Sequence, residues 1–546
     1  MSYYQTGTEP IGRLNRLFAK NGSFKTMDKN IFLPVSLLAL IGVGCQPKME
    51  TPPNVVVIYA DDIGYGDLGC YGATAVKTPN VDRLAAEGVR FTSAYACAAT
   101  CTPSRYGLLT GQYPFRRNDT GVARGDAPMI IRKEQYTVAD LMKDAGYTTG
   151  VVGKWHLGLG EGEFNSQDWN GLITPGPGEI GFDYSYIMAA TGDRTPCVLI
   201  EDGHIENLDP ADPIEVSYTA PFEGEPLGRT HPELLKMHPS HGHDMAIVNG
   251  ISRIGYMRGG KSAWWVDENI ADSITLKAVQ FIENNLPEKT GKPFFLYFGA
   301  HDIHVPRTPH PRFVGATDMG PRGDCIVEFD WSVGQILEAL DRLGLAENTL
   351  VILSSDNGPV VDDGYHDEAV TRLGDHRPAG VFRGGKYSAF EAGTRVPFMV
   401  RWPSKVNPGV SEAAVSQIDF FGVMSKITGN PVPDDAAPDT FDSSDTWLGL
   451  SDQGREYVVI QSASSQISLI RDQWKLIPPS RHSRYNPQVN IELGHDTIPQ
   501  LYNLANDPGE QQNLAAGHPD KVETFAGEIM KLRNTEVTRP QVVNEN

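Results

Sequence analysis

Residues Asn54-Val-Val-Val-Ile-Tyr-Ala60 form a continuous apolar run, and Asp61-Asp62 follow it directly. A run of this length that is rich in β-branched residues, with no polar alternation, is typical of a strand buried on both faces of a parallel sheet. In such sheets ligands bind where loops leave the carboxyl ends of the strands. The stretch therefore predicts a fold class and also the sheet edge at which polar side chains gather.

Apolar strands and helical patterns alternate along the next 300 residues. Further strands are predicted at 148–152, 294–300 and 350–354, and helices at 78–86, 138–145, 274–285 and 326–343. Alternation of this kind favours an α/β fold, in which helices flank a mostly parallel sheet. The region 160–260 is irregular and rich in Gly and Pro, which indicates a long insertion beside the site.

The character of the sequence changes after about residue 430. Residues 431–444 are rich in Pro and Asp and are typical of a linker. Strands at 456–461, 466–470 and 473–477, followed by a helix at 521–532, predict a small α+β unit. We therefore expect a catalytic domain over 54–430 and a smaller α+β domain over 445–546.

An apolar run over residues 31–43 lies between Met27 and Cys45. It is shorter than the roughly 20 residues that a membrane-spanning helix needs, and it fits the core of a signal peptide. Small residues before Cys45 favour a lipoprotein-type signal over 27–45, with an ordinary secretory signal as the alternative. The expected protein is exported, in the periplasm or on the surface of a bacterium, and touches a membrane only through a lipid on Cys45.

The chain carries 47 basic and 68 acidic side chains, a net charge of −21. A nucleic acid would be repelled by the average surface, because phosphate binding normally leaves a basic footprint. The same acidity disfavours wrapping any long polyanion. We therefore expect no nucleic-acid partner, and action at the end of a chain if the substrate is anionic.

Three carboxylates and one amide follow two of the predicted strands. Asp61 and Asp62 come after the first strand, and Asp356 and Asn357 follow the strand at 350–354. Oxygen ligands of this kind suit Ca²⁺ or Mg²⁺ better than a softer metal. Asp-Asn-Gly also makes ordinary turns after strands, which is the alternative for each motif alone. Their combination at one sheet edge favours a metal site.

The stretch Cys101-Thr-Pro-Ser-Arg-Tyr-Gly-Leu-Leu-Thr-Gly111 predicts a helix whose first turn contains Pro103. Cys101 then lies at the helix N-terminus, where free N–H groups and the positive end of the dipole attract an anion. Arg105 lies about one turn further on and could reach the same anion. The pattern indicates a reactive cysteine facing an anionic substrate, or else a buried cysteine that only begins a helix.

The Cys-x-Pro-Ser-Arg stretch with Leu-Leu-Thr-Gly resembles the signature of type I sulfatases, which belong to the alkaline phosphatase superfamily. Other stretches look like family motifs in the expected order: Asp61-Asp62, Gly153-Lys-Trp-His156, Asp356-Asn-Gly358, Gly384-Gly-Lys386 and Leu501-Tyr-Asn-Leu504. In that family a maturation enzyme oxidises the cysteine to formylglycine, whose hydrated aldehyde is the nucleophile. The resemblance implies an alkaline-phosphatase-like fold, a sulfate-ester hydrolase and Ca²⁺ in preference to Mg²⁺.

The resemblance also implies roles for individual residues. The expected catalytic set is Cys101 (as formylglycine and also a metal ligand), Arg105, Lys154, His156, His304 and Lys386. The three cationic side chains would neutralise the sulfuryl oxygens. His304 would protonate the departing alcohol, and His156 would take a proton from the second hydroxyl so that sulfate is expelled.

The pattern that includes Gly192-Asp193-Arg194 looks closest to galactose- or N-acetylgalactosamine-6-sulfatases, with a glucosamine-type or aryl sulfatase as alternative. The stretch between Asp356 and Lys386 would border the pocket, which makes His366, Asp375 and His376, with Asp193 and Arg194, candidates for sugar contacts; a solvent-facing loop is the alternative. Asp375→Ala or His376→Ala is then expected to lower kcat/KM on a sugar sulfate and to spare an aryl sulfate.

Two rival functions fit parts of the same pattern. One is a phosphodiesterase or phosphonate hydrolase of the same superfamily, and the other is a glycan-binding protein in which Cys101 is never converted. Two further features are expected to be unremarkable: a surface or pocket-rim role for His231, His238, His241 and His243, and a solvated helix face for Asp324, Glu328 and Asp330.

Overall fold

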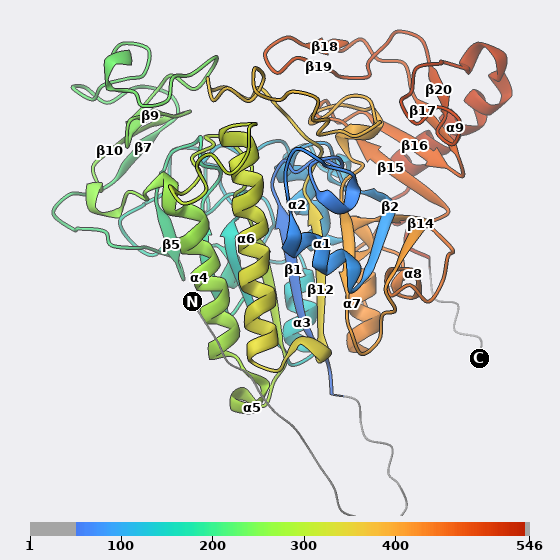
Figure 1. The fold of residues 1–546 in the computed structure, drawn as a ribbon, viewed down its shortest axis with the longest axis horizontal. Coiled ribbons are helices and arrows are strands. Elements are labelled where there is room, and N and C mark those ends of the chain that lie inside the picture. The colour runs from blue at the N-terminus through green and yellow to red at the C-terminus, as the bar shows by residue number, and fades with distance from the viewer. Residues whose placement is uncertain (1–50, 541–546) are drawn as a thin grey trace, which may run out of the picture. The chain divides into compact units, whose positions relative to one another are not determined.

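A computed structural model describes residues 51–540, and its centre is one mixed sheet of ten strands (Figure 1). The strand order is β14-β2-β13-β12-β1-β11-β3-β4-β5-β6. The bounds are β1 Asn54–Ala60, β2 Val89–Tyr95, β3 Thr148–Lys154, β4 Tyr184–Met188, β5 Leu199–Glu201, β6 His204–Ile205, β11 Phe294–Gly299, β12 Thr349–Ser355, β13 Phe398–Arg401 and β14 Gly409–Ser416. The predicted signal peptide over 27–45 lies outside the described residues.

The middle strands β12, β1, β11, β3 and β4 run parallel, and β13, β5 and β6 make the antiparallel pairs of the sheet. β1 lies between β11 and β12, with Val56 in register with Leu296 and Val351. Every residue of β1 is buried, as its unbroken apolar run requires. The predicted α/β fold with a parallel-to-mixed sheet is therefore confirmed.

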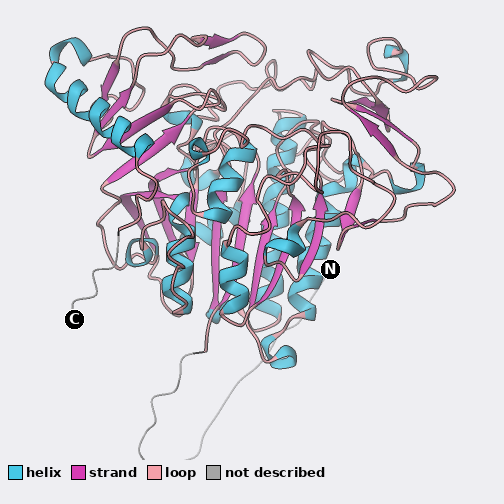
Figure 2. Ribbon diagram, turned by 180° about the vertical axis from the view of Figure 1, so that it is seen from behind, coloured by secondary structure: helices cyan, strands magenta, loops and turns pink. Residues whose placement is uncertain are grey.

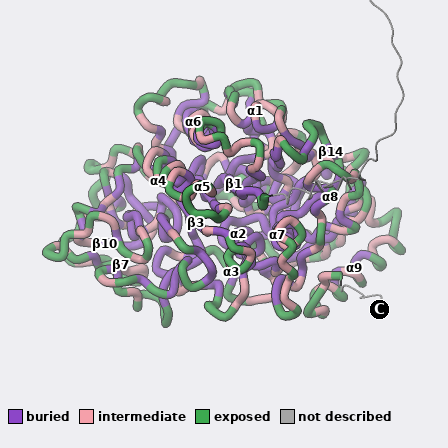
Figure 3. The backbone as a smooth tube through the Cα atoms, turned by 90° about the horizontal axis from the view of Figure 1, so that it is seen from below, coloured by how far each residue is buried: buried purple, intermediate pink, exposed green. Residues whose placement is uncertain are grey.

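Helices cover both faces of this sheet (Figures 1 and 3). One face carries α1 Pro79–Ala86, α4 Ile270–Asn284 and α6 Pro321–Arg342, and the other carries α2 Cys101–Thr110, α3 Val138–Asp144 and α7 Phe420–Thr428. Each helix buries the stripe that faces the sheet; α7, for example, buries Phe420, Phe421 and Val423. Among the described residues, no helix has both the length and the apolar character needed to span a bilayer.

The acidic side chains of α6 are not solvated, so that expectation was wrong. Asp324, Glu328 and Asp330 are only 2–3% exposed. Asp330 accepts hydrogen bonds from the backbone N–H groups of Asn80 and Val81 at the start of α1, at 3.0 and 2.9 Å. Asp324 and Glu328 accept from loop N–H groups in the same way. These carboxylates accept hydrogen bonds from backbone N–H groups of neighbouring segments. Because this role depends on tertiary packing, the helical periodicity of the sequence does not reveal it.

The insertion predicted over 160–260 consists of loops and short strands. Within this range β4, β5 and β6 extend the central sheet, so the region is not irregular throughout. Outside that sheet it forms β7 Glu215–Ser217 paired with β10 Tyr256–Arg258, and β8 Ile247–Val248 paired with β9 Ile251–Ser252. Figure 2 shows them on the right, beyond the edge of the central sheet and level with the upper ends of its strands. The insertion is therefore placed to build one wall of a site at those strand ends.

The C-terminal part contains a second, antiparallel sheet in the order β15-β16-β17-β20. The bounds are β15 Tyr457–Gln461, β16 Ile467–Arg471, β17 Trp474–Ile477 and β20 Gln500–Asn503, with α9 Pro519–Asn534 packed on one face. Three of these strands and the helix were predicted, and β20 was not. A short hairpin, β18 Tyr485–Asn486 and β19 Ile491–Glu492, lies between β17 and β20 in the chain.

The stretch 431–444, expected to be a linker, packs on the catalytic part. Asp439 is fully buried and accepts hydrogen bonds from Tyr113 N at 2.8 Å and Arg116 Nη2 at 2.5 Å. Directly beyond this stretch, in the short helix α8 Ser444–Trp447, Trp447 packs edge-on against Phe398 of β13. The described chain from Pro52 onward thus forms one compact unit, and the boundary between the two expected domains is a packed interface.

Candidate active site

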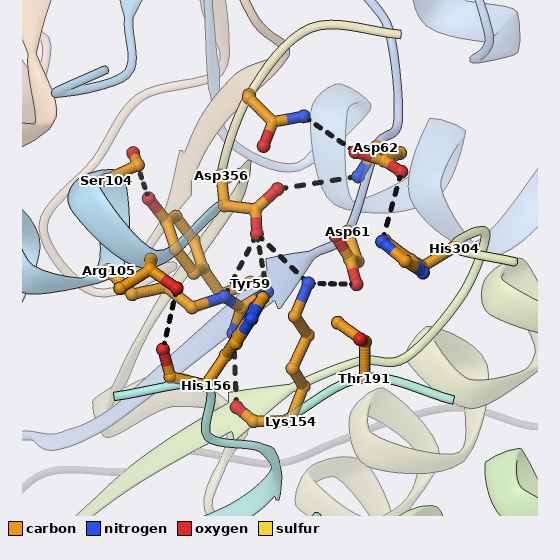
Figure 4. Close-up of polar contacts among 12 residues, drawn as sticks. Tyr59, Asp61, Asp62, Ser104, Arg105, Lys154, His156, Thr191, His304 and Asp356 are labelled. Atoms are coloured by element: carbon orange, nitrogen blue, oxygen red, sulfur yellow. Dashed lines mark hydrogen bonds and ion pairs between the residues drawn. The ribbon is translucent and has the colours of Figure 1, made fainter. Parts of the chain in front are cut away.

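Four predicted oxygen ligands meet at the carboxyl ends of β1 and β12 (Figure 4). Asp62 N–H lies 3.4 Å from Asp356 Oδ1, and Asn357 Nδ2 donates to Asp62 Oδ1 at 2.7 Å. Asp61 adjoins them, and all four side chains are fully buried. Strands far apart in the sequence therefore deliver these groups to one point, as the strand-end argument predicted.

Two lysines balance this negative charge. Lys154, at the end of β3, is hydrogen-bonded to the Asp61 carboxylate and lies 3.7 Å from Asp356 Oδ2. Lys386 Nζ lies 2.9 Å from Asp62 Oδ2. Burial would raise the pKa of Asp62, but these lysines outweigh it and hold that pKa below its usual value. Asp61 behaves differently, because its burial raises the pKa more than Lys154 lowers it.

The oxygen set fits a divalent cation. Asp61 Oδ1 and Asn357 Oδ1 are buried without a hydrogen-bond partner in the described part of the chain. Unsatisfied buried oxygens of this kind are costly unless a ligand completes them. Asp61, Asp62 and His304 also bring one potential ligand atom each to within 4.8 Å of one another. The residues could therefore hold a hard metal ion with carboxylate and amide oxygens.

Cys101 begins α2, as predicted. Thr100 precedes it in extended conformation, and the helix ends at Gly111, whose φ of 60° is the left-handed conformation that glycine readily adopts. The Thr102 hydroxyl donates to the backbone carbonyl of His156 at 2.9 Å, which fixes the helix start against the loop after β3. Cys101 is 2% exposed and reaches a cavity; burial raises the pKa of its thiol, although nearby lysines oppose the shift.

Arg105 is directed at Asp356 and does not line the cavity. Its Nε donates to Asp356 Oδ2 at 2.9 Å, and its Nη1 donates to the backbone carbonyl of Lys154 at 3.1 Å. The side chain is fully buried. Its guanidinium therefore fixes the Asp356 carboxylate, whereas the sequence suggested direct contact with the substrate anion.

The two predicted histidines differ in position. His156 Nε2 donates to the Ala123 carbonyl at 2.9 Å, which leaves its buried Nδ1 without a partner in the described chain. His304 Nδ1 donates to the Val305 carbonyl at 2.8 Å, and its Nε2 lies 3.9 Å from Asp62 Oδ2. Burial, together with nearby cations that include Lys154, lowers the pKa of both rings well below the usual value. Both imidazoles are neutral in this state.

A cavity of about 310 Å³ opens above these groups, with Cys101, His304 and Lys386 in its wall. The insertion contributes Asp193 and its neighbours, and the β18–β19 hairpin contributes Asn486 and others. Lys154 and His156, like Arg105, lie behind this wall. Of the six predicted catalytic residues, the three in the cavity wall can therefore touch a substrate. The other three lie behind the wall and contact residues of the site instead.

The insertion presents a charged cluster to the cavity. Asp193 Oδ2 lies 3.0 Å from His243 Nε2, and Arg194 Nη1 lies 3.0 Å from Asp193 Oδ1. Burial would raise the pKa of Asp193, but the charge of Arg194 and the His243 hydrogen bond lower it. His241 also lines the cavity, so the pocket-rim expectation fits that residue and His243. His231 and His238 are exposed, which agrees with the surface role expected for them.

The stretch expected to read the sugar lies mostly elsewhere. His366 and Asp375 are exposed and are not among the cavity residues. His376 is buried, where its Nε2 donates to Asp67 Oδ1 at 2.8 Å. Arg322 holds the same Asp67 carboxylate with two bonds of 2.8 Å. The geometry gives no support to a sugar contact by these three residues. Of the stretch between Asp356 and Lys386, the residue that lines the cavity is Asp363.

Sequence reasoning missed the contributions of Asp363, Tyr387, Asn486 and Gln488 to the cavity. Tyr387 carried a usable signal, because it follows Lys386 directly. The two amide residues lie more than 380 positions after Cys101 in a loop-like stretch. No local pattern indicates that such a stretch returns to the site.

An α/β fold with candidate metal ligands at its strand ends, a helix-start cysteine and two cationic side chains in the cavity wall favours a hydrolase of anionic esters. Comparison with known proteins specifies the class further. Residues 53–430 match the family described as Sulfatase, so the chain belongs to the sulfatase family and is a sulfuric ester hydrolase. The match begins just before β1 and ends beyond α7.

Relatives support the same family over most of the chain. It is 50% identical over 507 residues to an N-acetylgalactosamine-6-O-sulfatase from Bacteroides thetaiotaomicron, covering 91% of this chain and 98% of the relative. It is 31% identical over 508 residues to human arylsulfatase A, covering 89% and 87%.

Solved structures agree with the fold. One, described with the metabolism of multiple glycosaminoglycans by Bacteroides thetaiotaomicron, has a TM-score of 0.87 at 51% identity and covers 89% of this chain and all of its own. The phosphonate monoester hydrolase of Agrobacterium radiobacter, at 18% identity and a TM-score of 0.53 over 88% of this chain and 95% of its own, shares the fold alone. The alkaline-phosphatase-like architecture is thus confirmed.

Proposed function

We propose that this sulfatase removes a 6-sulfate from an N-acetylgalactosamine or galactose unit at the end of a glycan chain. The observation that carries the proposal is the 50% identity, over nearly the whole chain, to a relative named for N-acetylgalactosamine 6-sulfate. The Asp193–Arg194–His243 cluster supports it, because it presents polar groups suited to sugar hydroxyls beside the cysteine.

The proposed nucleophile is Cys101 after conversion to formylglycine by a separate maturation enzyme; the hydrated side chain supplies a hydroxyl that attacks sulfur. Its position at the start of α2 supports this role, since helix N–H groups favour an anion there. Lys386 reaches the same cavity and would bind the sulfate group, neutralising the charge that shifts onto its oxygens.

Asp61, Asp62, Asp356 and Asn357 would hold one divalent cation, Ca²⁺ by family resemblance and Mg²⁺ as alternative. When bound, this cation supplies Lewis-acid stabilisation to the sulfate oxygens. Arg105 fixes the orientation of Asp356, and Lys154 neutralises Asp61. These two residues act as positioning residues, because neither lines the cavity.

His304 is the proposed proton donor to the leaving alcohol. Its neutral ring carries the proton on Nδ1, so Nε2 must gain a second proton before it can donate. A bound sulfate anion favours that gain, because a nearby negative charge raises the pKa of an imidazole. His156 would then accept a proton at its free Nδ1 from the remaining hydroxyl, and sulfate leaves as the aldehyde re-forms.

Action at a chain end follows from the size and charge of the molecule. A cavity of about 310 Å³ lies at the lower end of the range for small-ligand sites, so its size favours a terminal unit over the interior of a long chain. The net charge of −21 disfavours close approach of a long sulfated polymer along its length. A lipid-anchored, exported enzyme, as residues 27–45 suggest, would encounter such glycans outside the cytoplasm.

Parallel assays test the proposal. The protein, co-expressed with a maturation enzyme, is given the 6-sulfates of N-acetylgalactosamine, galactose and N-acetylglucosamine, an aryl sulfate and an aryl phosphodiester. We expect the highest kcat/KM on a galactose-configured 6-sulfate. Faster turnover of the phosphodiester would favour the phosphodiesterase alternative. Mass spectrometry of the peptide containing residue 101 tests the other rival, since an unmodified thiol without turnover would leave a glycan-binding protein.

A further inference from the structure

The β18–β19 hairpin of the C-terminal part forms one wall of the active-site cavity. Asn486, Gln488 and Val489 all line that cavity, although the hairpin belongs to neither the central sheet nor the insertion. Figures 1 and 2 show the hairpin above the upper ends of the central strands, where the metal ligands lie. The hairpin therefore belongs to the substrate site, by position, as much as the insertion does.

Several contacts hold the hairpin against the segment that carries Lys386. Val489 and Ile491 form a small apolar cluster with Val360, and Tyr387, next to Lys386, packs against it. The Ser388 hydroxyl donates to the Glu492 carbonyl at 2.7 Å, and Arg383 forms a salt bridge with the Glu492 carboxylate at 2.7 Å. A wall fixed in this way is organised before substrate arrives, so little conformational entropy is lost on binding.

The polar groups that the hairpin presents are amides. The side chain of Asn486 accepts a hydrogen bond from the Gln488 backbone N–H at 3.1 Å, which shapes the turn. The Gln488 side chain is exposed and makes no hydrogen bond within the described residues. An amide offers two donors and an acceptor, which suits sugar hydroxyls and requires no charge on the ligand.

The deep part of the cavity leaves little room for a second sugar. Cys101, His304 and Lys386 would surround the sulfate, and a cavity of about 310 Å³ lies at the small end of the range for ligand sites. The unit linked to that sugar must therefore leave the cavity along its wall. The hairpin supplies wall groups that have the chemistry to meet it.

We infer that Asn486 and Gln488 form a binding subsite for the sugar attached to the sulfated terminal unit. This inference rests on the proposed function. The subsite binds hydroxyl groups of the attached sugar through side-chain amides and takes no part in the chemical step. It gives a disaccharide an advantage over a monosaccharide that carries the same sulfate.

The test compares two substrates that differ only in the attached sugar. Wild type, Gln488→Ala, Asn486→Ala/Gln488→Ala and the control Gln473→Ala are assayed on N-acetylgalactosamine 6-sulfate and on a disaccharide with that unit at its non-reducing end. Gln473 is an exposed glutamine of the same C-terminal region that does not line the cavity. Gln488→Ala should lower kcat/KM on the disaccharide about fivefold, since one neutral hydrogen bond is lost.

The double variant should lose more on the disaccharide, while both variants keep monosaccharide turnover within about twofold of wild type and Gln473→Ala changes neither. Equal losses on both substrates, or no loss on either, would overturn the subsite. So would a wild-type enzyme that cleaves the monosaccharide but not the disaccharide. A wild-type enzyme that cleaves neither sugar, yet cleaves an aryl sulfate, would instead overturn the proposed substrate. Unchanged melting temperatures of the variants exclude misfolding.

Discussion

At the residue scale, the proposed metal site around Asp61 and Asp62 predicts the effect of removing a divalent cation. Within the described residues, Asp61 and Asn357 each keep one buried oxygen without a hydrogen-bond partner, while Lys154, Lys386 and Arg105 are each paired with one of the three carboxylates. Removing a bound divalent ion would leave these buried oxygens unsatisfied and would also remove its binding energy from the folded state. Exhaustive chelation should therefore lower both activity and melting temperature, and Ca²⁺ should restore both more fully than Mg²⁺.

Elemental analysis of the purified protein should find one divalent ion per chain. Full activity in a chelated protein that contains no metal would contradict this assignment. Asp61→Asn provides an independent check, because it preserves the size of the side chain but weakens the affinity for the ion.

The proposed role of His304 predicts a dependence on the leaving group. Loss of a general acid slows reactions by about 10²–10⁴-fold when the leaving alcohol needs a proton. His304→Ala should lower kcat on a sugar sulfate by that order and on a nitrophenyl sulfate far less, because a nitrophenolate leaves without protonation. The exposed His238→Ala is the control and should change neither rate. Equal losses on both substrates would assign His304 to binding or to the metal.

His376 has a structural role in this molecule, and its substitution should affect stability. The ring donates to Asp67, which Arg322 also holds, in the buried interior. His376→Ala should cost about 1–3 kcal/mol of stability, the range for leaving a buried polar partner partly unsatisfied. Turnover of sugar and aryl sulfates should then fall in equal proportion. The neighbouring Asp375→Ala, at an exposed position, should leave melting temperature and both activities unchanged.

Some of the residues at this site could be predicted from the sequence, and others could not. The meeting of Cys101, Lys386 and the four candidate oxygen ligands at one site was predictable, because each follows or lies in a recognisable strand or motif. His376 was not, since nothing in its neighbourhood distinguishes a sugar ligand from a partner of Asp67, more than 300 residues away. Long-range pairing of a polar side chain leaves no periodic trace in the sequence.

At the element scale, α6 carries buried carboxyl groups that titrate abnormally. Burial and the charge of Asp302 raise the pKa of Glu328 to about 9. Asp272 and Arg312 also face it, and the Cys325 sulfur lies in the same group as Asp302. In the folded protein Glu328 therefore keeps a proton that the unfolded chain loses near pH 4.5.

Folding then takes up a proton between these two pH values, so stability falls as pH rises toward 9, by up to about 1.4 kcal/mol per pH unit for this group. Glu328→Gln keeps an oxygen for the His310 N–H but does not titrate. Its melting temperature should fall less than that of wild type between pH 6 and pH 8. The exposed Glu338→Gln on the same helix should behave like wild type; a similar decrease in all three proteins would contradict the assignment.

The prediction of elements succeeded where a segment forms its own pattern. β1, β3, β11 and β12 are apolar runs, and they occur within two residues of the expected bounds. β20 and the β18–β19 hairpin were not predicted. The hairpin strands have only two residues each, too few for alternation to appear, and β20 is separated from the consecutive strands at 457–477 by a long irregular stretch. Their pairing is decided by β17 and by packing against the catalytic part, which are tertiary effects.

At the scale of the whole molecule, an acidic protein places two cationic side chains in the wall of its active-site cavity. The net charge is −21, yet Lys386 and Arg194 reach the cavity beside the nucleophile position. A sulfate group is therefore attracted only locally, while a long polyanion meets a repulsive surface. This division of charge favours terminal groups that can enter the cavity alone.

The small size of the active-site cavity affects how the enzyme acts on long chains. The insertion, the 383–390 segment and the C-terminal hairpin wall a cavity of only about 310 Å³, so we expect a terminal unit to place its sulfate beside residue 101 far more readily than an internal unit. On oligosaccharides in which every repeat carries a 6-sulfate, the enzyme should release one sulfate per chain, whatever the chain length. Ion chromatography of released sulfate, with mass spectrometry of the product, measures this ratio. Release that increases with the number of repeats would show that the cavity admits internal units; an added exo-glycosidase that trims each desulfated end should make release continue stepwise along the chain.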